Sequence, residues 1–150
     1  MKLILCAGTR HVKGFKTHDV KAYDGTDYVC DLFDIGQHVS ENSCDEIHFT
    51  HALEHFPQAE TQKVLGLIYG LLKPFGKLYI EVPNFSWHAQ LVQEGKHREA
   101  VYYAFGGQLD EWDFHKTGFT YSILKEELEK AKFRDIRISG MDCLHAHAIK

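Results

Sequence analysis

Residues 45–82 restrict the fold of this chain more than any other stretch. Residues 45–50 form a strand candidate with Ile47 and Phe49 on one face, and residues 77–82 alternate apolar and polar side chains before Pro83. Between them, residues 59–72 repeat apolar side chains at helical spacing, and the turn-forming residues 73–76 are predicted to end that helix. A strand, a helix and a second strand form a right-handed βαβ crossover, so the pattern predicts an α/β fold with a parallel sheet.

The rest of the chain extends this pattern on both sides. Strands are predicted at residues 3–7, 15–19 and 28–33, and helices at 86–94, 97–105 and 122–132, the last with Ser122 as its cap. Residues 133–139 and 143–149 are predicted to form a C-terminal antiparallel hairpin. With 150 residues, we expect one domain over residues 1–150.

The first two crossovers are unusually short. Only residues 8–14 separate the first two strands, whereas a parallel crossover normally takes a dozen or more residues, usually with a helix. The second and third strands are also joined without a helical pattern. One face of the sheet should therefore lack cover at that end and expose apolar surface, which a second copy of the chain could bury in a homodimer.

Charge and cysteine usage exclude several classes of partner. The formal net charge is −4, and the basic residues are scattered, so we expect no nucleic-acid partner. The longest nearly unbroken apolar run, residues 64–72, falls far short of the roughly 18 residues that span a bilayer, so no membrane segment is expected. Four widely spaced cysteines without a Cys-x-x-Cys pair predict reduced thiols in the cytoplasm.

Several local strings carry a more specific signal. They are Asp31-Leu32, Ser-Cys-Asp-Glu-Ile at 43–47, His-Ala-Leu-Glu-His-Phe at 51–56, Leu-Leu-Lys-Pro-Phe-Gly-Lys-Leu-Tyr-Ile at 71–80 and Val-Pro-Asn at 82–84. Together they resemble the class I S-adenosylmethionine (SAM)-dependent methyltransferases, in particular the small bacterial and phage-like ones. The resemblance runs from about residue 2 to 138. It implies a Rossmann-like, mostly parallel twisted sheet and SAM as cofactor. It also implies direct in-line methyl transfer to a small-molecule or saccharide-type acceptor, without a required metal.

The resemblance also implies a cofactor site. Cys6, Ala7 and Gly8 occupy the place of the family's Gly-x-Gly-x-Gly loop, of which Gly8 alone is kept. Asp19 matches the acidic residue that accepts hydrogen bonds from the ribose, and Asp31 matches the one near the adenine amino group. The remaining cofactor residues are predicted to be Leu32, an apolar wall, and Thr50 and His51, which follow the fourth strand.

Acceptor-side residues are predicted around the same strand ends. His51 is the first choice for a general base, because an imidazole can remove a proton from the acceptor. The stretch 106–119 resembles a Gly-Gly…His-Lys-x-Gly-Phe loop that would close over the cofactor and acceptor. The resemblance places His115 there as a second catalytic candidate. It also places His55, Asn84, Trp112, His115 and Lys116 against the substrate.

Two alternatives stay open. Because Cys6 and Arg10 replace the flanking glycines, the chain could be a degenerate methyltransferase-like protein that serves as a binding partner or scaffold. His51-Ala-Leu-Glu54-His55 also satisfies His-x-x-Glu-His, the helical zinc motif of inverted metalloproteases, which would make the chain a zinc-dependent hydrolase.

Overall fold

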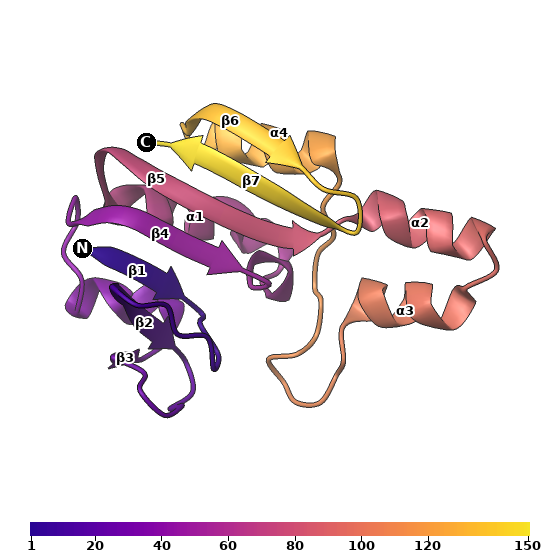
Figure 1. Cartoon of the computed structure of the whole chain (residues 1–150), viewed down its shortest axis with the longest axis horizontal. Coiled ribbons are helices and arrows are strands. Elements are labelled where there is room, and N and C mark those ends of the chain that lie inside the picture. Colours follow the sequence, from indigo (N-terminus) through magenta and orange to yellow (C-terminus); the bar gives the residue numbers. More distant parts are fainter.

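The computed structural model describes residues 1–150, which contain one seven-stranded sheet (Figure 1). The spatial order is β3-β2-β1-β4-β5-β7-β6. Neighbours among β1 to β5 pair in parallel, and β7 pairs antiparallel with both β5 and β6. This confirms the mostly parallel sheet with a C-terminal antiparallel hairpin. The strands are β1 (Lys2–Leu5), β2 (Phe15–Asp19), β3 (Tyr28–Val29), β4 (Cys44–Thr50), β5 (Leu72–Pro83), β6 (Arg134–Ser139) and β7 (Cys143–Ile149).

Four α-helices and three short 3-10 helices connect the strands. They are η1 (Leu32–Gln37), η2 (Leu53–His55), η3 (Gln58–Glu60), α1 (Thr61–Leu71), α2 (Phe85–Gln93), α3 (His97–Phe105) and α4 (Tyr121–Lys130). Helix α1 buries Val64, Leu65 and Ile68 because their spacing places them on one face. The predicted βαβ unit is therefore present as β4, α1 and β5. None of the helices is long and apolar enough to cross a membrane.

The predicted strand 28–33 is wrong beyond its first two residues. Strand β3 ends at Val29, and Asp31 begins η1 by accepting a hydrogen bond from the backbone N–H of Phe33 at 2.8 Å. A short polar side chain that bonds the backbone two residues ahead favours a turn over a strand. The carboxylate at position 31 therefore lies at a helix start.

Two predicted boundaries also need correction. Residues 73–76 were predicted to end the helix as a turn, but they belong to β5. There the pairing with β4 is irregular, because Leu72 faces Cys44 while Lys77 faces Glu46, and Phe75 has a φ of 63°. Helix α4 is capped by Thr120, whose hydroxyl accepts from the backbone N–H of Ile123. The cap therefore lies two residues before Ser122, the residue that was predicted to cap this helix.

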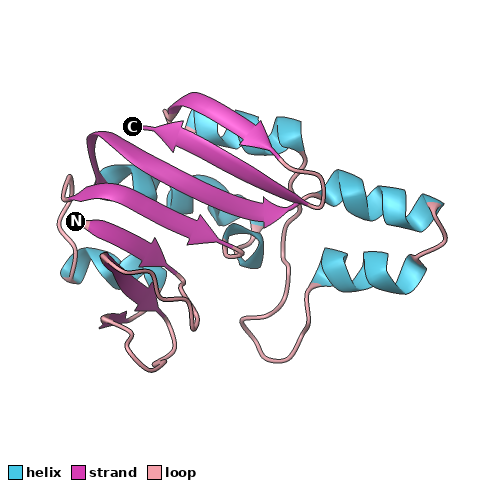
Figure 2. Ribbon diagram, in the orientation of Figure 1, coloured by secondary structure: helices cyan, strands magenta, loops and turns pink.

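Helices cover only one face of the sheet. Figures 1 and 2 show α1 and α4 behind the strands, and the apolar core joins η1, α1 and α4 to the residues that point to that side. The connections β1–β2 and β2–β3 contain no helix, as predicted, and the uncovered face extends across the whole sheet. It is less apolar than expected, because it carries a row of ring contacts that runs Phe15, His48, Tyr79, His147.

Helices α2 and α3 form an antiparallel pair beyond the end of β5 (Figure 1). Asn84 caps α2 by accepting from the N–H of Ser86, and Gly106 ends α3 with a φ of 80°. The chain then returns as a long loop toward the end of β4 before α4 begins (Figure 2). This loop brings residues 106–119 to the carboxyl ends of the parallel strands.

Candidate functional site

A cleft of about 610 Å³ lies beyond the carboxyl ends of β1, β2 and β4. Ligands of open α/β sheets bind at this position, where the strand order changes direction. The cleft brings together nine of the predicted site residues: Cys6, Gly8, Asp19, Asp31, Leu32, His51, His55, Trp112 and Lys116. Segments up to 110 residues apart in the chain therefore meet in one depression of a size that holds a small molecule.

The loop after β1 turns sharply at the floor of this cleft. Cys6 and Gly8 have φ values of 50° and 54°, a backbone conformation that side chains disfavour. A Cβ placed on Gly8 would meet no atom within 4 Å, so the space beside it is open. Burial raises the pKa of the Cys6 thiol, which keeps it protonated. The positive φ values are those that a glycine-rich loop would adopt, although Cys6 stands where such a loop has a glycine.

The two predicted carboxylates line the cleft in different environments. Asp19 is 7% exposed and accepts backbone hydrogen bonds from Gly8 at 2.8 Å and Lys21 at 2.9 Å. Asp31 is exposed and uses one oxygen to cap η1. Each carboxylate oxygen can accept more than one hydrogen bond, so both side chains can still bind donors of a ligand.

His18 was not predicted, yet it fixes the loop. Its ring is fully buried, accepts from the backbone N–H of Cys6 at 3.4 Å and donates from Nε2 to the carbonyl of Cys30 at 3.0 Å. Burial lowers the pKa of His18, and this outweighs the opposite effect of Asp19 and Asp31. A neutral imidazole therefore connects the ends of β1, β2 and β3.

This depressed pKa predicts loss of stability in acid. Above the unfolded-state pKa of about 6.5, His18 is neutral in both states and has no effect on the free energy of unfolding. Below it, the unfolded chain binds the proton more readily, so stability falls until the pH reaches the folded-state pKa. Urea midpoints measured at pH 7 and pH 5 should drop more in the wild type than in His18→Gln. An equal drop in both proteins would contradict this assignment.

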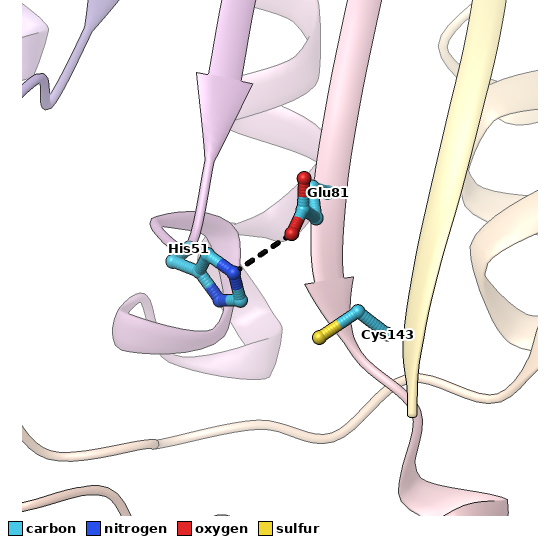
Figure 3. A group of neighbouring side chains, drawn as sticks. All are labelled: His51, Glu81 and Cys143. Atoms are coloured by element: carbon cyan, nitrogen blue, oxygen red, sulfur yellow. Dashed lines mark hydrogen bonds and ion pairs between the residues drawn. The ribbon is translucent and has the colours of Figure 1, made fainter. Parts of the chain in front are cut away.

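His51 follows β4 directly and is held by a carboxylate on the neighbouring strand. Figure 3 shows its ring turned toward Glu81 of β5, with Cys143 beside them. Nε2 of His51 donates to Oε1 of Glu81 at 2.9 Å, which leaves Nδ1 free to accept a proton. The carboxylate of Glu54 raises the pKa of His51, and Glu81 acts in the same direction against the effect of burial. A carboxylate that orients an imidazole is the arrangement of a general base.

The loop 106–119 is fastened over the cleft at two places. The backbone N–H groups of Lys116 and Thr117 donate to the carbonyl of Glu54 at 2.7 and 3.2 Å. Lys21, after β2, forms an ion pair with Asp110 of the loop, and both side chains line the cleft. This placement agrees with the predicted closing loop and puts Trp112 and Lys116 at the cleft wall.

Four predicted residues do not line the cleft. The hydroxyl of Thr50 accepts from Arg10 at 2.8 Å, and the amide of Asn84 donates to the carbonyl of Met141 at 2.8 Å. Ala7 is buried behind the loop, and His115 lies beside His55, with ring centroids 4.9 Å apart. Their assigned ligand contacts stay predictions.

Other cleft residues escaped the sequence analysis. They are His18, Val20, Lys21, Tyr23, Phe33, Ala52, Phe56, Pro57, Glu60, Asp110 and Asp113. Lys21 had a usable signal, because it follows Asp19 by two residues at the end of a strand. His18 belongs to β2, and Asp110 and Asp113 belong to the loop 106–119 that was predicted to close over the site. The others reach the cleft from turns, loops and 3-10 helices whose local patterns predict no shared position.

The metalloprotease-type helix is absent. His51 follows β4 with a φ of 49°, and only Leu53–His55 form one turn of 3-10 helix. The zinc motif of that class needs both imidazoles on one face of an α-helix. The alternative of an inverted metalloprotease therefore loses its structural basis.

No protein-family model matches the sequence, and no curated protein sequence matches it either. Solved structures do match over 99% of the chain. A SAM-dependent methyltransferase from Archaeoglobus fulgidus aligns with a TM-score of 0.74 at 16% identity, over 85% of its own length. The chain has the fold of SAM-dependent methyltransferases.

Two further structures with this fold hold cofactor or product. The Burkholderia thailandensis 1,6-didemethyltoxoflavin N1-methyltransferase, solved with S-adenosylhomocysteine, aligns with a TM-score of 0.63 at 17% identity over 70% of its length. Human N-acetylserotonin methyltransferase, in complex with SAM, aligns with a TM-score of 0.63 at 13% identity over 47% of its length. At these identities the likeness establishes the methyltransferase fold.

Proposed function

We propose that the chain is a SAM-dependent methyltransferase that acts on a small-molecule acceptor, of which saccharides are one candidate class. The observation that carries the proposal is the cleft itself. In a methyltransferase fold, Asp19 and Asp31 line one cleft with the open turn at Gly8 and the imidazole of His51. The proposed cytoplasmic location is supported by four free cysteines.

The residues present fit the cofactor. A ribose needs hydrogen-bond acceptors, and Asp19 supplies a buried carboxylate at the end of β2. An adenine needs apolar surface and an acceptor for its amino group, which Leu32, Phe33 and Asp31 provide at the start of η1. Lys116 is a cation within the same cleft that can face the cofactor's carboxylate, whereas Lys21 is paired with Asp110.

SAM, when bound, would supply a methyl group on a sulfonium sulfur, and transfer of that methyl group to the acceptor's nucleophilic atom would release the sulfur as a neutral thioether. His51 takes the acceptor's proton on Nδ1, because its Nε2–H is already donated to Glu81. The loop 106–119 holds the acceptor and excludes water.

The scaffold alternative rests on what the cofactor loop lacks. No helix follows Gly8, so no helix N-terminus helps to hold an anion there. The backbone of the loop nevertheless keeps the turn that a glycine-rich motif would make, and Asp19 is already hydrogen-bonded to it. These contacts favour a cofactor-binding enzyme over a degenerate scaffold.

The carboxylates give a direct test by calorimetric titration with SAM. Asp19→Ala is expected to weaken binding by about 1–3 kcal/mol, which is roughly 5- to 150-fold in Kd, because buried ligand donors lose an acceptor. Asp31→Asn keeps an oxygen for the cap of η1 and should weaken binding by a smaller factor.

Asp34→Asn is the matched control. Asp34 also lies on η1, but it accepts from the side chain of Gln37 and does not line the cleft. Its Kd should equal that of the wild type. Equal affinity in Asp19→Ala, Asp31→Asn and the wild type would contradict the proposed cofactor site.

A further inference from the structure

Glu54, His55 and His115 form a cluster at the edge of the cleft. Their carboxylate and imidazole ligand atoms all lie within 4.8 Å of one another. Glu54 and His55 belong to η2, and His115 belongs to the loop before α4. The hydrogen bonds from the backbone of Lys116 and Thr117 to the Glu54 carbonyl hold the two segments together.

The carboxylate of Glu54 is buried without a partner. The residue is 1% exposed, and neither of its oxygens makes a hydrogen bond. The nearest basic atoms are Nδ1 of His51 at 3.6 Å and Nε2 of His55 at 4.0 Å, both too distant for one. An ionised carboxylate in this position requires a compensating cation.

Each imidazole of the cluster has one ring nitrogen without a hydrogen bond. Nδ1 of His55 donates to the carbonyl of Phe114 at 3.2 Å, and Nδ1 of His115 donates to the carbonyl of Tyr103 at 2.9 Å. A carbonyl only accepts, so in the neutral rings the proton is on Nδ1 and the lone pair is on Nε2. Metal-binding histidines are typically oriented by such a hydrogen bond from the other ring nitrogen.

We propose that Glu54, His55 and His115 bind a divalent transition-metal ion. Two imidazole nitrogens and one carboxylate oxygen suit Zn²⁺, Mn²⁺, Fe²⁺ or Co²⁺, whereas Mg²⁺ and Ca²⁺ prefer oxygen ligands alone. The ion would supply a direct ligand contact for the Glu54 carboxylate, whose two oxygens make no hydrogen bond. It also explains why a conformation with three electron-rich groups in one place can be stable.

The ion would have open positions for the acceptor. Three protein ligands leave a metal such as Zn²⁺ at least one further position, and His55 lines the cleft next to His51 and Lys116. This step rests on the proposed function. An open metal position beside the cleft favours an acceptor that offers a hydroxyl oxygen to the metal. Coordination would lower the pKa of that hydroxyl and make it a better nucleophile.

The second group of this kind, His51, Glu81 and Cys143, is a poorer metal site. Glu81 is already engaged, because it accepts hydrogen bonds from His51 and Tyr79 at 2.9 Å each. Burial raises the pKa of the Cys143 thiol to about 11, so it carries its proton at neutral pH, whereas the thiolate is the form that binds metal.

Metal binding by the full chain tests the proposal without any methyl transfer. The protein is treated with a chelator, dialysed and titrated with Zn²⁺ by calorimetry and with Co²⁺ by visible absorption. One ion per chain is expected, with d–d bands of cobalt bound to nitrogen and oxygen. Mg²⁺ should give no heat. Absence of Zn²⁺ and Co²⁺ binding would overturn the proposal.

Variants identify the ligands. Glu54→Gln, which keeps the size of the side chain, and His115→Ala should each weaken Zn²⁺ binding more than about 100-fold, since even indirect partners of a metal contribute 10- to 100-fold. His97→Ala removes an exposed imidazole at the start of α3 and should leave binding unchanged. Circular dichroism confirms that each variant is folded. Wild-type affinity in both cluster variants would overturn the assignment.

The absorption spectrum of the cobalt-loaded protein tests the proposed class of acceptor. Catechol, which carries two adjacent hydroxyls, should change the absorption bands of the cobalt-loaded protein if open positions face the cleft. An unchanged spectrum would overturn the claim that the ion binds an acceptor oxygen. Titration with SAM distinguishes a failure of this inference from a failure of the proposed function. Metal binding without SAM binding would support the metal site and contradict the methyltransferase. SAM binding without metal binding would support the methyltransferase and contradict the metal site.

Discussion

His51→Asn is expected to transfer methyl groups about 100- to 10,000-fold more slowly than the wild type, the usual contribution of a general base. Asparagine tolerates the positive φ that His51 adopts, so the backbone at the end of β4 should be retained. Its amide cannot take a proton at neutral pH. The measurement is the initial rate of label transfer from methyl-labelled SAM into a fractionated small-molecule extract.

His48→Asn is the matched control for this measurement. His48 lies on the same strand, but it points to the uncovered face, where its ring bonds Glu46 at 2.7 Å. Its rate should match that of the wild type. A rate in His51→Asn within a few-fold of the control would show that the proton leaves by another route.

Ile68→Ala is expected to lower the free energy of unfolding by about 2–5 kcal/mol, as large-to-small changes in a core do. Ile68 is fully buried in the middle of α1, against the single face of the sheet that helices cover. Because the other face has no helical layer, this core supplies most of the apolar burial. Urea unfolding followed by circular dichroism measures the change.

His147→Ala tests how much the uncovered face of the sheet contributes to stability. His147 is an exposed residue of β7 on the uncovered face, where its ring contacts Tyr79. Its removal should change stability by less than about 0.5 kcal/mol, as for most surface positions. A loss as large as that of Ile68→Ala would mean that the uncovered face is buried in solution, as in the homodimer that the short crossovers suggested.

The sequence was enough to predict those strands and helices whose apolar side chains repeat at regular spacing. The alternation before Pro83 and the stripe through Val64 and Ile68 correctly placed β5 and α1, because each element buries one face of regular spacing. The strand predicted at 28–33 failed because the cap formed by Asp31 outweighs the β-propensity of its neighbours. The uncovered face was predicted at one end from loop lengths alone, and the structure extends it to the whole sheet.

The site residues that could be predicted from the sequence are those at the ends of parallel strands. Gly8, Asp19 and His51 each lie at or shortly after the carboxyl end of a parallel strand, so topology brings them to one cleft. The ion pair of Lys21 with Asp110 and the unpaired carboxylate of Glu54 depend on contacts across the sequence that no local pattern encodes. For that reason the absence of a metal was expected from the sequence, whereas the side-chain geometry supports one.

Calorimetric titration of the wild-type chain with S-adenosylhomocysteine is the most direct test of the proposed cofactor site. This ligand carries the same ribose, adenine and amino-acid groups as SAM and cannot be consumed. Saturable binding at one site per chain is expected, with a rise in Tm that follows ligand concentration. No heat and no thermal stabilisation at millimolar ligand would contradict it and leave a methyltransferase fold without its cofactor.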